Sequence, residues 1–316
     1  MNTLFKPCAT IFPMELVFVV LEIALHTKGP IIPLLLICKA CYQFLIPRFY
    51  CEIHLNSQQL LRFARIEDYS TLSAHLRHLT FNGYNSLAKL SGILSNAHNL
   101  SSLTLNITKT SDDPRDFIIL LIAESIPSNL KSLRIAGPAF MHLPTTTTSP
   151  NFPNLRLVEF DRFPCDRSGI GNMCIARLAN KLAGQNPPLQ ALLIKNNKYF
   201  KPELLKAVIS DIGAELLYLN LEGSQLNGTT LRAIANQLPK LRALAVGRCD
   251  DITTEDLDRF VERNAEVNAN VNGRVGLDIY VGRCPKICIG DLRMKCRIRH
   301  GTSFEIQEVK NELNLV

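Results

Sequence analysis

A six-residue pattern, apolar-x-x-apolar-x-apolar, recurs along the chain and constrains its fold more than any other feature. Full copies begin at Leu76, Leu100, Leu130, Leu155, Leu189, Leu216 and Leu241. An earlier copy begins at Tyr50, and a degenerate copy ends as Ile279-x-Val281. The copies start 24 to 35 residues apart. A period of this size predicts a solenoid, whose units bury their apolar side chains against neighbouring units, and this explains the 48 leucines among 316 residues.

The segments between the copies fit helices. They are 57–72, 85–97, 114–125, 170–183, 201–213, 229–237 and 253–266. Pro202 suits a first helical turn and Gly213 a helix end. Thr253 suits an N-cap, with acidic residues following in the first turn. A strand, a helix and a strand at this spacing give parallel strands, so we expect an α/β solenoid.

Residues 50–284 resemble the longer leucine-rich repeats, whose unit is a strand and a helix. The best copies carry the Asn or Cys of that signature after the strand, at Asn197, Cys249 and Cys284. A side chain there can bridge the backbone where the chain leaves the strand. The resemblance implies parallel strands on the inner face of the solenoid and helices on the outer face.

Residues 10–49 do not follow the repeat, and they resemble an F-box. The F-box opening Leu-Pro-x-Glu-Leu is matched by Phe12-Pro13-Met14-Glu15-Leu16, with Phe12 in place of the leucine. Its second landmark, an apolar run ending Val-Cys-Lys/Arg-x-x-Trp, is matched by residues 36–41, with Cys41 in place of the tryptophan. A short helical unit cannot bury a full core alone, so its spare apolar surface must lie on the repeats or on another protein.

The F-box resemblance implies docking to the Skp-type adaptor of a cullin-RING ubiquitin ligase, with the repeats holding a protein substrate. The residues that the resemblance assigns to adaptor contact are Phe12, Pro13, Glu15, Leu16, Val20, Ile37 and Cys38. Many fungal F-box leucine-rich-repeat proteins share this layout. The alternative is that residues 12–49 are only the N-terminal cap that a solenoid needs.

Side chains that alternate with the apolar set in each strand are expected to face the concave side. From these positions we predict a substrate-binding surface made of His78, Thr80, Arg134, Glu159, Asp161, Lys195, Tyr218, Asn220 and Glu222. Tyr and Arg are common energetic hot spots in interfaces. The copy at Leu241 offers only Ala243, Ala245 and Gly247 at these positions. The mixed charge of the set favours a protein surface over a polyanion.

Residues 285–316 form a basic C-terminal segment. Arg293, Lys295, Arg297 and Arg299 alternate with apolar residues, a pattern that predicts a strand with one solvated face and hence a C-terminal cap. A basic run can also contact nucleic acid. Cys284, Cys288, Cys296 and His300 offer four potential zinc ligands, but their spacing matches no common zinc module.

Composition and motifs exclude several other classes of function. A net charge of +7 is well below that of a nucleic-acid binder with a concentrated basic stripe. We find no phosphate-binding loop, nucleophile elbow or metalloprotease helix, so we expect no enzyme activity, no cofactor and no metal. The apolar N-terminal stretch is broken by charges and prolines, so we expect no membrane span. The 10 cysteines fit a reducing compartment, cytoplasmic or nuclear.

Segment 136–153 contains four prolines and four consecutive threonines, Thr145–Thr148. This composition predicts a loop inserted between repeats, in which a phosphate would be accessible.

These observations predict a non-catalytic substrate-recognition subunit of an SCF-type ubiquitin ligase. The alternative is a leucine-rich-repeat interaction scaffold with no connection to a ligase. The identity of the substrate is not encoded in any feature above, because concave surfaces of solenoids vary freely.

Overall fold

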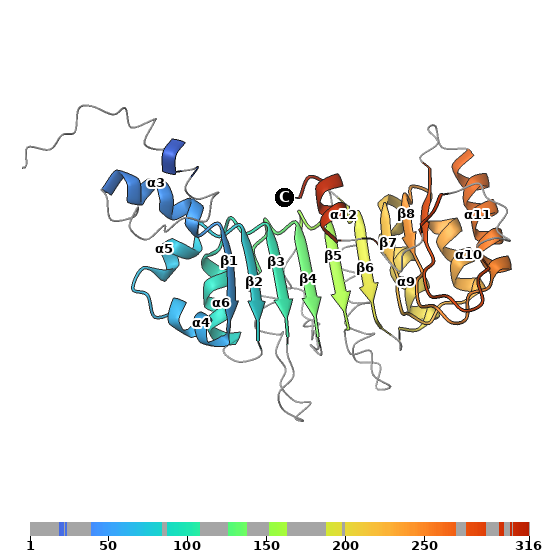
Figure 1. The fold of residues 1–316 in the computed structure, drawn as a ribbon, viewed down its shortest axis with the longest axis horizontal. Coiled ribbons are helices and arrows are strands. Elements are labelled where there is room, and N and C mark those ends of the chain that lie inside the picture. The colour runs from blue at the N-terminus through green and yellow to red at the C-terminus, as the bar shows by residue number, and fades with distance from the viewer. Residues whose placement is uncertain are drawn as a thin grey trace, which may run out of the picture.

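The described strands form one ten-stranded sheet in which each strand pairs with the next in sequence, and every pairing is parallel (Figure 1). The computed structural model describes residues 19–21, 23, 39–83, 87–107, 126–137, 152–162, 188–197, 200–269, 276–288, 297–299, 304 and 306–315. The strands are β1 (Glu52–Asn56), β2 (His78–Asn82), β3 (Ser102–Asn106), β4 (Ser132–Ala136), β5 (Leu157–Asp161), β6 (Ala191–Lys195), β7 (Tyr218–Asn220), β8 (Ala243–Ala245), β9 (Asp278–Tyr280) and β10 (Arg297–Arg299). This strand order confirms the predicted α/β solenoid of parallel strands.

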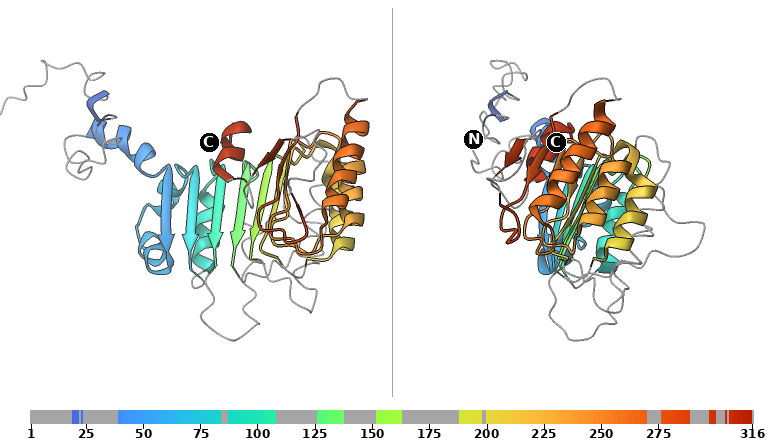
Figure 2. Two further views of the ribbon diagram at one scale, coloured as in Figure 1. Left: turned by 45° about the vertical axis from the view of Figure 1, so that its right-hand side comes forward. Right: turned by 90° about the vertical axis from the view of Figure 1, so that its right-hand side faces the viewer.

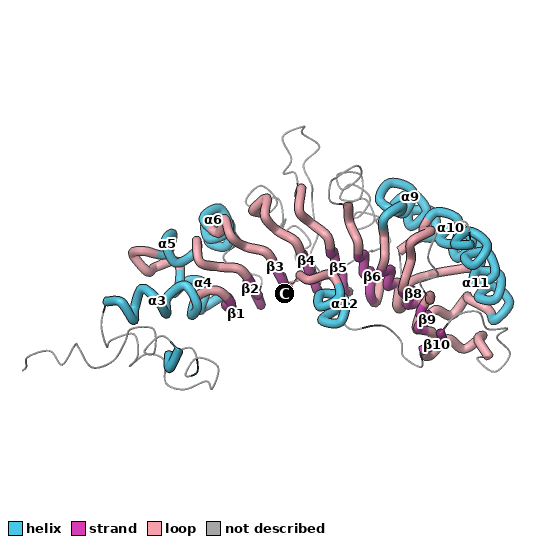
Figure 3. Tube along the Cα trace, turned by 90° about the horizontal axis from the view of Figure 1, so that it is seen from above, coloured by secondary structure: helices cyan, strands magenta, loops and turns pink. Residues whose placement is uncertain are grey.

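The helices that follow the strands cover the outer side of an arc, and the strands line its inner side (Figures 2 and 3). The helices are α3 (Lys39–Phe49), α4 (Ser57–Phe63), α5 (Tyr69–Ser73), α6 (Leu87–Asn96), α9 (Pro202–Ile212), α10 (Gly228–Gln237), α11 (Thr254–Ala269) and α12 (Ile306–Glu312), with a short 3-10 turn at Gly213–Glu215. The terminal helix α12 is different, because it lies on the inner side of the arc (Figure 3).

Two apolar rows run across the sheet beneath the helices and form the main core. The register places Leu79 beside Leu103, and Phe81 beside Leu105, and this pairing of like positions continues from strand to strand. These side chains are at most 1% exposed, and they belong to one cluster that extends from Ile46 to Cys284. The core is therefore continuous along the solenoid, and each repeat buries its leucines against the next.

Five of the seven predicted helical segments fall on described residues, and each contains helix. Segment 57–72 holds two short helices, α4 and α5, in place of one, and segments 114–125 and 170–183 lie outside the described residues. The predicted ends of α9 are confirmed, with Pro202 in its first turn and Gly213 at its C-cap. The predicted cap of α11 is also confirmed. Thr253 Oγ1 accepts a hydrogen bond from the Asp256 amide at 3.2 Å, and the Asp256 carboxylate accepts one from the Thr253 amide at 3.2 Å.

Polar side chains link the backbones of adjacent repeats. Asn197 Nδ2 donates to the carbonyl of Phe160 in the preceding repeat at 3.5 Å and to the carbonyl of Lys195 in its own repeat at 2.9 Å. Cys284 Sγ donates to the carbonyl of Val246 in the preceding repeat at 3.1 Å. Cys249 Sγ lies 3.6 Å from two carbonyl oxygens in the same way. The predicted role of Asn197, Cys249 and Cys284 at the strand exits is therefore confirmed. Burial raises the pKa of the Cys249 thiol to about 12, so it remains a neutral donor.

A second series of side-chain hydrogen bonds between adjacent repeats, which we call the asparagine ladder, was not predicted. Asn99, Asn129 and Asn154 each precede the first leucine of a hexad, and each donates through Nδ2 to a backbone carbonyl of the preceding repeat, at 2.8, 2.8 and 3.1 Å. The asparagine before that leucine is the signal that would have identified the ladder. Its effect is to satisfy carbonyl groups that no strand pairing reaches.

The C-terminal segment continues the sheet and then turns back. Strand β10 pairs in parallel with β9, with Ile298 packed against the main core and Arg297 and Arg299 exposed. This is the predicted strand with one solvated face. Both arginines contact the carboxylate of Asp278, at 2.7 and 3.5 Å. Residues 304–315 then lie over the concave side, an arrangement that the prediction of a simple cap did not include.

The N-terminal segment is described only in part. Helix α3 and residues 19–21 and 23 precede β1, but the remainder of the predicted F-box-like unit 10–49 lies outside the described residues. The threonines Thr145–Thr148 and most of the inserted loop lie outside them as well. Among the helices of the described part of the chain, none is both long and apolar enough to cross a membrane.

The stacked core makes a direct prediction for Phe160, which is 1% exposed between neighbouring repeats. Phe160→Ala should lower the free energy of unfolding by about 3–5 kcal/mol, because it leaves a cavity that neighbouring repeats fill only partly. Urea unfolding monitored by circular dichroism measures the change. Lys131→Ala, at an exposed position in the preceding repeat, is the control and should stay within about 0.5 kcal/mol of wild type. Equal effects of the two variants would contradict a core shared between repeats.

Candidate functional site

The concave face consists of three rows of side chains, one from each strand position that points away from the main core. The register aligns the first strand residues, such as His78, Ser102 and Ser132, in one row. It aligns the third residues, such as Thr80 and Thr104, in a second row, and the fifth residues in a third. The predicted alternation of strand residues between core and concave face is therefore confirmed for these strands.

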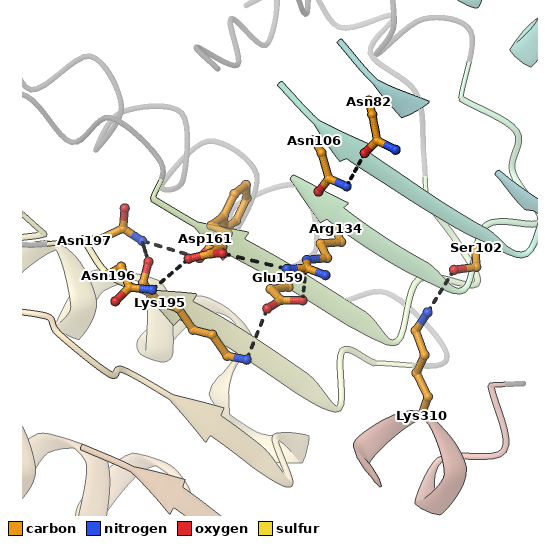
Figure 4. A network of polar contacts seen from close by, with 11 residues as sticks. Asn82, Ser102, Asn106, Arg134, Glu159, Asp161, Lys195, Asn196, Asn197 and Lys310 are labelled. Atoms are coloured by element: carbon orange, nitrogen blue, oxygen red, sulfur yellow. Dashed lines mark hydrogen bonds and ion pairs between the residues drawn. The ribbon is translucent and has the colours of Figure 1, made fainter. Parts of the chain in front are cut away.

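The N-terminal part of this face is polar and open. His78 and Thr80 are half-buried, as predicted concave residues, and burial lowers the pKa of His78 below its usual value. The ring is therefore neutral at physiological pH. Asn106 Nδ2 donates to Asn82 Oδ1 at 2.6 Å across two strands, at the exit edge of the sheet (Figure 4). These groups offer a set of neutral hydrogen-bonding side chains to a partner.

A charged cluster occupies the centre of the concave face, on β4, β5 and β6 (Figure 4). Glu159 is 1% exposed and lies between two cations, with Arg134 Nε at 3.2 Å and Lys195 Nζ at 3.2 Å. The Arg134 contact is an ion pair without an aligned hydrogen bond. Asp161 lies 3.8 Å from the Arg134 guanidinium and accepts a hydrogen bond from Asn196 at 2.9 Å.

This geometry changes the role expected of the cluster. A buried carboxylate requires compensating charge, and the two cations supply it from neighbouring repeats. Four of the predicted substrate-binding residues therefore bind one another first. Arg134 and Lys195 keep 33% and 14% of their side-chain surfaces exposed, so they remain the members that an incoming partner can reach.

The C-terminal members of the predicted surface are covered or internal in this structure. Tyr218 is 4% exposed beneath the C-terminal segment, and Asn220 is fully buried, its Oδ1 accepting from the Glu222 amide at 3.0 Å. Glu222 is 6% exposed and forms an ion pair with Arg248 at 3.3 Å. The expectation that Tyr218 and Asn220 lie open to solvent is therefore wrong. The physical reason is that the chain's own terminus covers the first, and a strand-exit turn encloses the second.

Sequence reasoning missed an apolar patch on the same face. Leu157, Ala191, Leu193, Tyr218, Ala243 and Ala245 occupy concave positions of β5 to β8, and they form a cluster separate from the main core. The corresponding positions of β2 to β4 are polar. Apolar residues at alternate strand positions that face away from the helices are the signal that would have identified the patch. Ala243 and Ala245 form the C-terminal end of this patch.

The C-terminal segment covers this apolar patch. Phe304, Val309, Leu313 and Leu315 are at most 8% exposed and complete the cluster. The Phe304 ring packs edge-on against Tyr218 and Tyr280, with ring centroids 6.0 and 5.5 Å apart. Phe304 precedes α12, Val309 lies on it, and Leu313 and Leu315 follow it, so the segment turns one aromatic and three aliphatic side chains toward the patch.

Two polar contacts fix the position of the segment. The Tyr218 hydroxyl donates to the Glu312 carboxylate, and burial together with this contact raises the pKa of Tyr218 to about 12. Lys310 Nζ donates to Ser102 Oγ at 3.1 Å, so the segment extends from β7 to β3 (Figure 4). Burial lowers the pKa of Lys310. Leu315 lines a shallow pocket with Arg77 and His78, at the edge of β2.

The described residues contain no group of three or more His, Cys, Asp or Glu side chains that is placed to hold a metal ion. Cys284 bonds to the backbone and Cys288 is exposed, whereas Cys296 and His300 lie outside the described residues.

Most of the predicted adaptor-contact residues lie outside the described residues. They are Phe12, Pro13, Glu15, Leu16, Ile37 and Cys38. Val20 is described and is 56% exposed, next to Val19 at 50% and near Ile23 at 57%. Cys41, at the position of the F-box tryptophan, is 1% exposed and faces inward on α3.

We expect removal of a buried charge in this cluster to lower the free energy of unfolding more than removal of an exposed charge does. Glu159→Gln should lower the free energy of unfolding by about 1.5–3 kcal/mol, because two cations lose the buried negative charge that compensates them. Asp251→Asn removes the exposed contact with Lys286 and should cost less than about 1 kcal/mol. Urea unfolding of both variants tests the difference. An effect of Glu159→Gln no larger than that of Asp251→Asn would show that the cluster is solvated.

No family model matches the chain, and no curated protein matches it. Chains of solved structures do match, and one of them belongs to the crystal structure of the Rad7 and Elc1 complex in yeast. That likeness covers 90% of this chain and 92% of the other, with 13% sequence identity and a TM-score of 0.35. At this TM-score the likeness carries no conclusion about function, which is argued below from the chain's own residues.

Proposed function

We propose that the chain is a non-catalytic substrate-recognition subunit of an SCF-type E3 ubiquitin ligase. The observation that carries the proposal is the separation of two surfaces of different chemistry. Among the described residues, most of the large apolar side chains that are exposed lie in the N-terminal segment that resembles an F-box, and the concave face of the solenoid presents polar and covered apolar surface. A receptor that joins a substrate to an adaptor needs two such surfaces that do not overlap.

The apolar surface of the N-terminal segment supports adaptor docking. Among the described residues, every large apolar side chain that is exposed lies between Val19 and Ile66, and none comes from the later repeats. Exposed apolar side chains that gather in one region mark protein-interaction sites. Leu21 is 2% exposed beside the exposed Val20, so this stretch buries one side and presents the other. The F-box resemblance of residues 12–16 and 36–39 assigns the presented side to a Skp-type adaptor and, through it, to a cullin-RING ligase.

The concave face supports binding of a protein substrate. Its open N-terminal part offers His78, Thr80 and amide groups, and its centre offers the exposed edges of Arg134 and Lys195. This mixture suits a polypeptide better than a polyanion, because Glu159 and Asp161 lie beside the two cations. The proposed receptor is neither an enzyme nor a nucleic-acid binder, and it acts in the cytoplasm or the nucleus.

Capture of a Skp-type adaptor tests the N-terminal half of the proposal. Wild-type protein co-expressed with the adaptor should retain it during purification. Val20→Asp should reduce the retained adaptor at least tenfold, since it places an unpaired charge in an apolar contact. Because Val20 is exposed, the substitution leaves the solenoid fold intact, as circular dichroism would verify.

Leu16→Asp should abolish capture in the same assay, and Leu16→Met, which preserves apolar volume, is its matched control. Failure of the wild-type protein to retain the adaptor, where a known F-box protein does, would overturn the ligase assignment. The chain would then be an interaction scaffold of the solenoid class. Capture that is unchanged by Val20→Asp and Leu16→Asp would place the interface elsewhere.

The substrate surface has an independent test. Proximity labelling in cells should identify proteins whose labelling falls in the double variant His78→Ala with Thr80→Ala, while adaptor capture stays at the wild-type level. The same substitutions at exposed outer positions, Gln58→Ala with Arg62→Ala on α4, provide the matched control. Identical labelling profiles for the two double variants would remove the open part of the concave face from the substrate site.

A further inference from the structure

The C-terminal segment 304–315 makes apolar contacts that the solenoid does not need for its own core. The main core runs between strands and helices through positions such as Leu192, Leu219 and Leu244. The second cluster lies on the opposite side of the same strands, where Phe304, Val309, Leu313 and Leu315 cover it. Without the segment, Leu157, Leu193 and three alanines would form an apolar patch on the concave face.

The segment contains one short helix, which depends on its contacts with the solenoid. Helix α12 has seven residues, and a helix of this length is marginal in water unless it packs against another surface. Two of its hydrogen bonds to the solenoid are the contacts Tyr218–Glu312 and Lys310–Ser102. Lys310 is half-buried in its contact, and this burial opposes the docked state because it removes part of a cation from water.

We propose that the apolar patch on β5 to β8 is the docking site for an amphipathic helical segment of the substrate, and that residues 304–315 occupy it in the absence of substrate. This inference deepens the proposed function, on which its biological role rests, by naming the class of substrate. We expect the substrate segment to carry an aromatic residue and then three aliphatic residues, spaced as Phe304, Val309, Leu313 and Leu315 are in this chain. An acidic residue at the position equivalent to Glu312 would accept a hydrogen bond from the Tyr218 hydroxyl.

Charge and position on the solenoid support this occupant. The patch lies next to the half-buried cations Arg134 and Lys195, and Lys310 comes between it and the polar residues of β3. A substrate segment that displaces residues 304–315 therefore exposes Ser102 and the edge of Glu159 along with the apolar surface. The open polar half of the concave face then becomes continuous with the apolar half, and a longer partner can extend across both.

The tether determines how the site would be regulated. A segment linked to its site through a short connection is present at an effective concentration on the order of millimolar. A free partner at micromolar concentration therefore competes poorly unless it binds much more tightly or the segment is released. The structure thus combines a binding site and a built-in competitor in one chain.

A peptide-binding measurement on the full-length protein tests the proposal. The probe is a fluorescein-labelled peptide of residues 303–316, and its fluorescence anisotropy is measured against wild type and against the double variant Val309→Asp with Leu313→Asp. The double variant should release its own segment and bind the peptide at least tenfold more tightly than wild type. Asn311→Asp, at an exposed position of the same helix, is the matched control and should behave as wild type.

Changes in the peptide keep the test independent of protein folding. A peptide that carries Phe304→Ala and Val309→Asp should bind the protein double variant with at least tenfold lower affinity than the unaltered peptide. A peptide that carries Asn311→Asp should bind it with unchanged affinity. In the protein, Tyr218→Phe combined with the double variant should weaken peptide binding several-fold by removing the hydrogen bond to Glu312.

Three results would overturn the proposal. The first is equal peptide affinity of wild type and the double variant. The second is loss of cooperative unfolding in the double variant, which would make residues 304–315 part of the structural core. The third is a wild-type dimer, measured by light scattering, that dissociates in the double variant, because the segment would then dock between two copies. None of these measurements involves the adaptor, so loss of adaptor capture and loss of peptide binding remain separate outcomes.

Discussion

Parallel pairing of each strand with its neighbour, in one register, is the constraint on which the rest of this structure depends. It aligns Leu79, Leu103, Leu133 and Val158 so that every repeat buries its apolar residues against two others. It also places asparagine and cysteine side chains against backbone carbonyls of adjacent repeats. Because no repeat is stable alone, a cavity in one repeat affects its neighbours, and the solenoid behaves as a chain of nearest-neighbour contacts.

The same register creates the concave surface and divides it by chemistry. Rows of alternate residues are polar on β2 and β3, charged on β4 to β6 and apolar on β5 to β8. The charged part is largely self-satisfied, since Glu159 already has two cationic partners. Recognition by this face therefore depends on the neutral polar groups at one end and on the apolar patch at the other. The central cations serve a partner only through their exposed edges.

Apolar residues are exposed near the N-terminal end of the described chain and buried near its C-terminal end. At the N-terminal end Val19, Val20 and Ile23 remain exposed. At the C-terminal end Phe304, Val309, Leu313 and Leu315 are buried on the chain's own concave face. Under the proposed function, the receptor would present one interface openly and keep the other covered by its own terminus, so that adaptor binding and substrate binding would respond to different changes in sequence.

Much of this architecture follows from the sequence alone, and one decisive part does not. The spacing of leucines determined the parallel α/β solenoid, and local signals at Pro202, Thr253 and Cys284 determined helix starts and strand exits, because each acts over a few residues. The coverage of Tyr218 by α12 depends on a contact between residues 94 positions apart, which no local pattern encodes. The pairing of Glu159 with Arg134 and Lys195 likewise needed the register. The tertiary structure therefore decided which part of the concave face is open, since only folding brings the C-terminal segment to the strands that it covers.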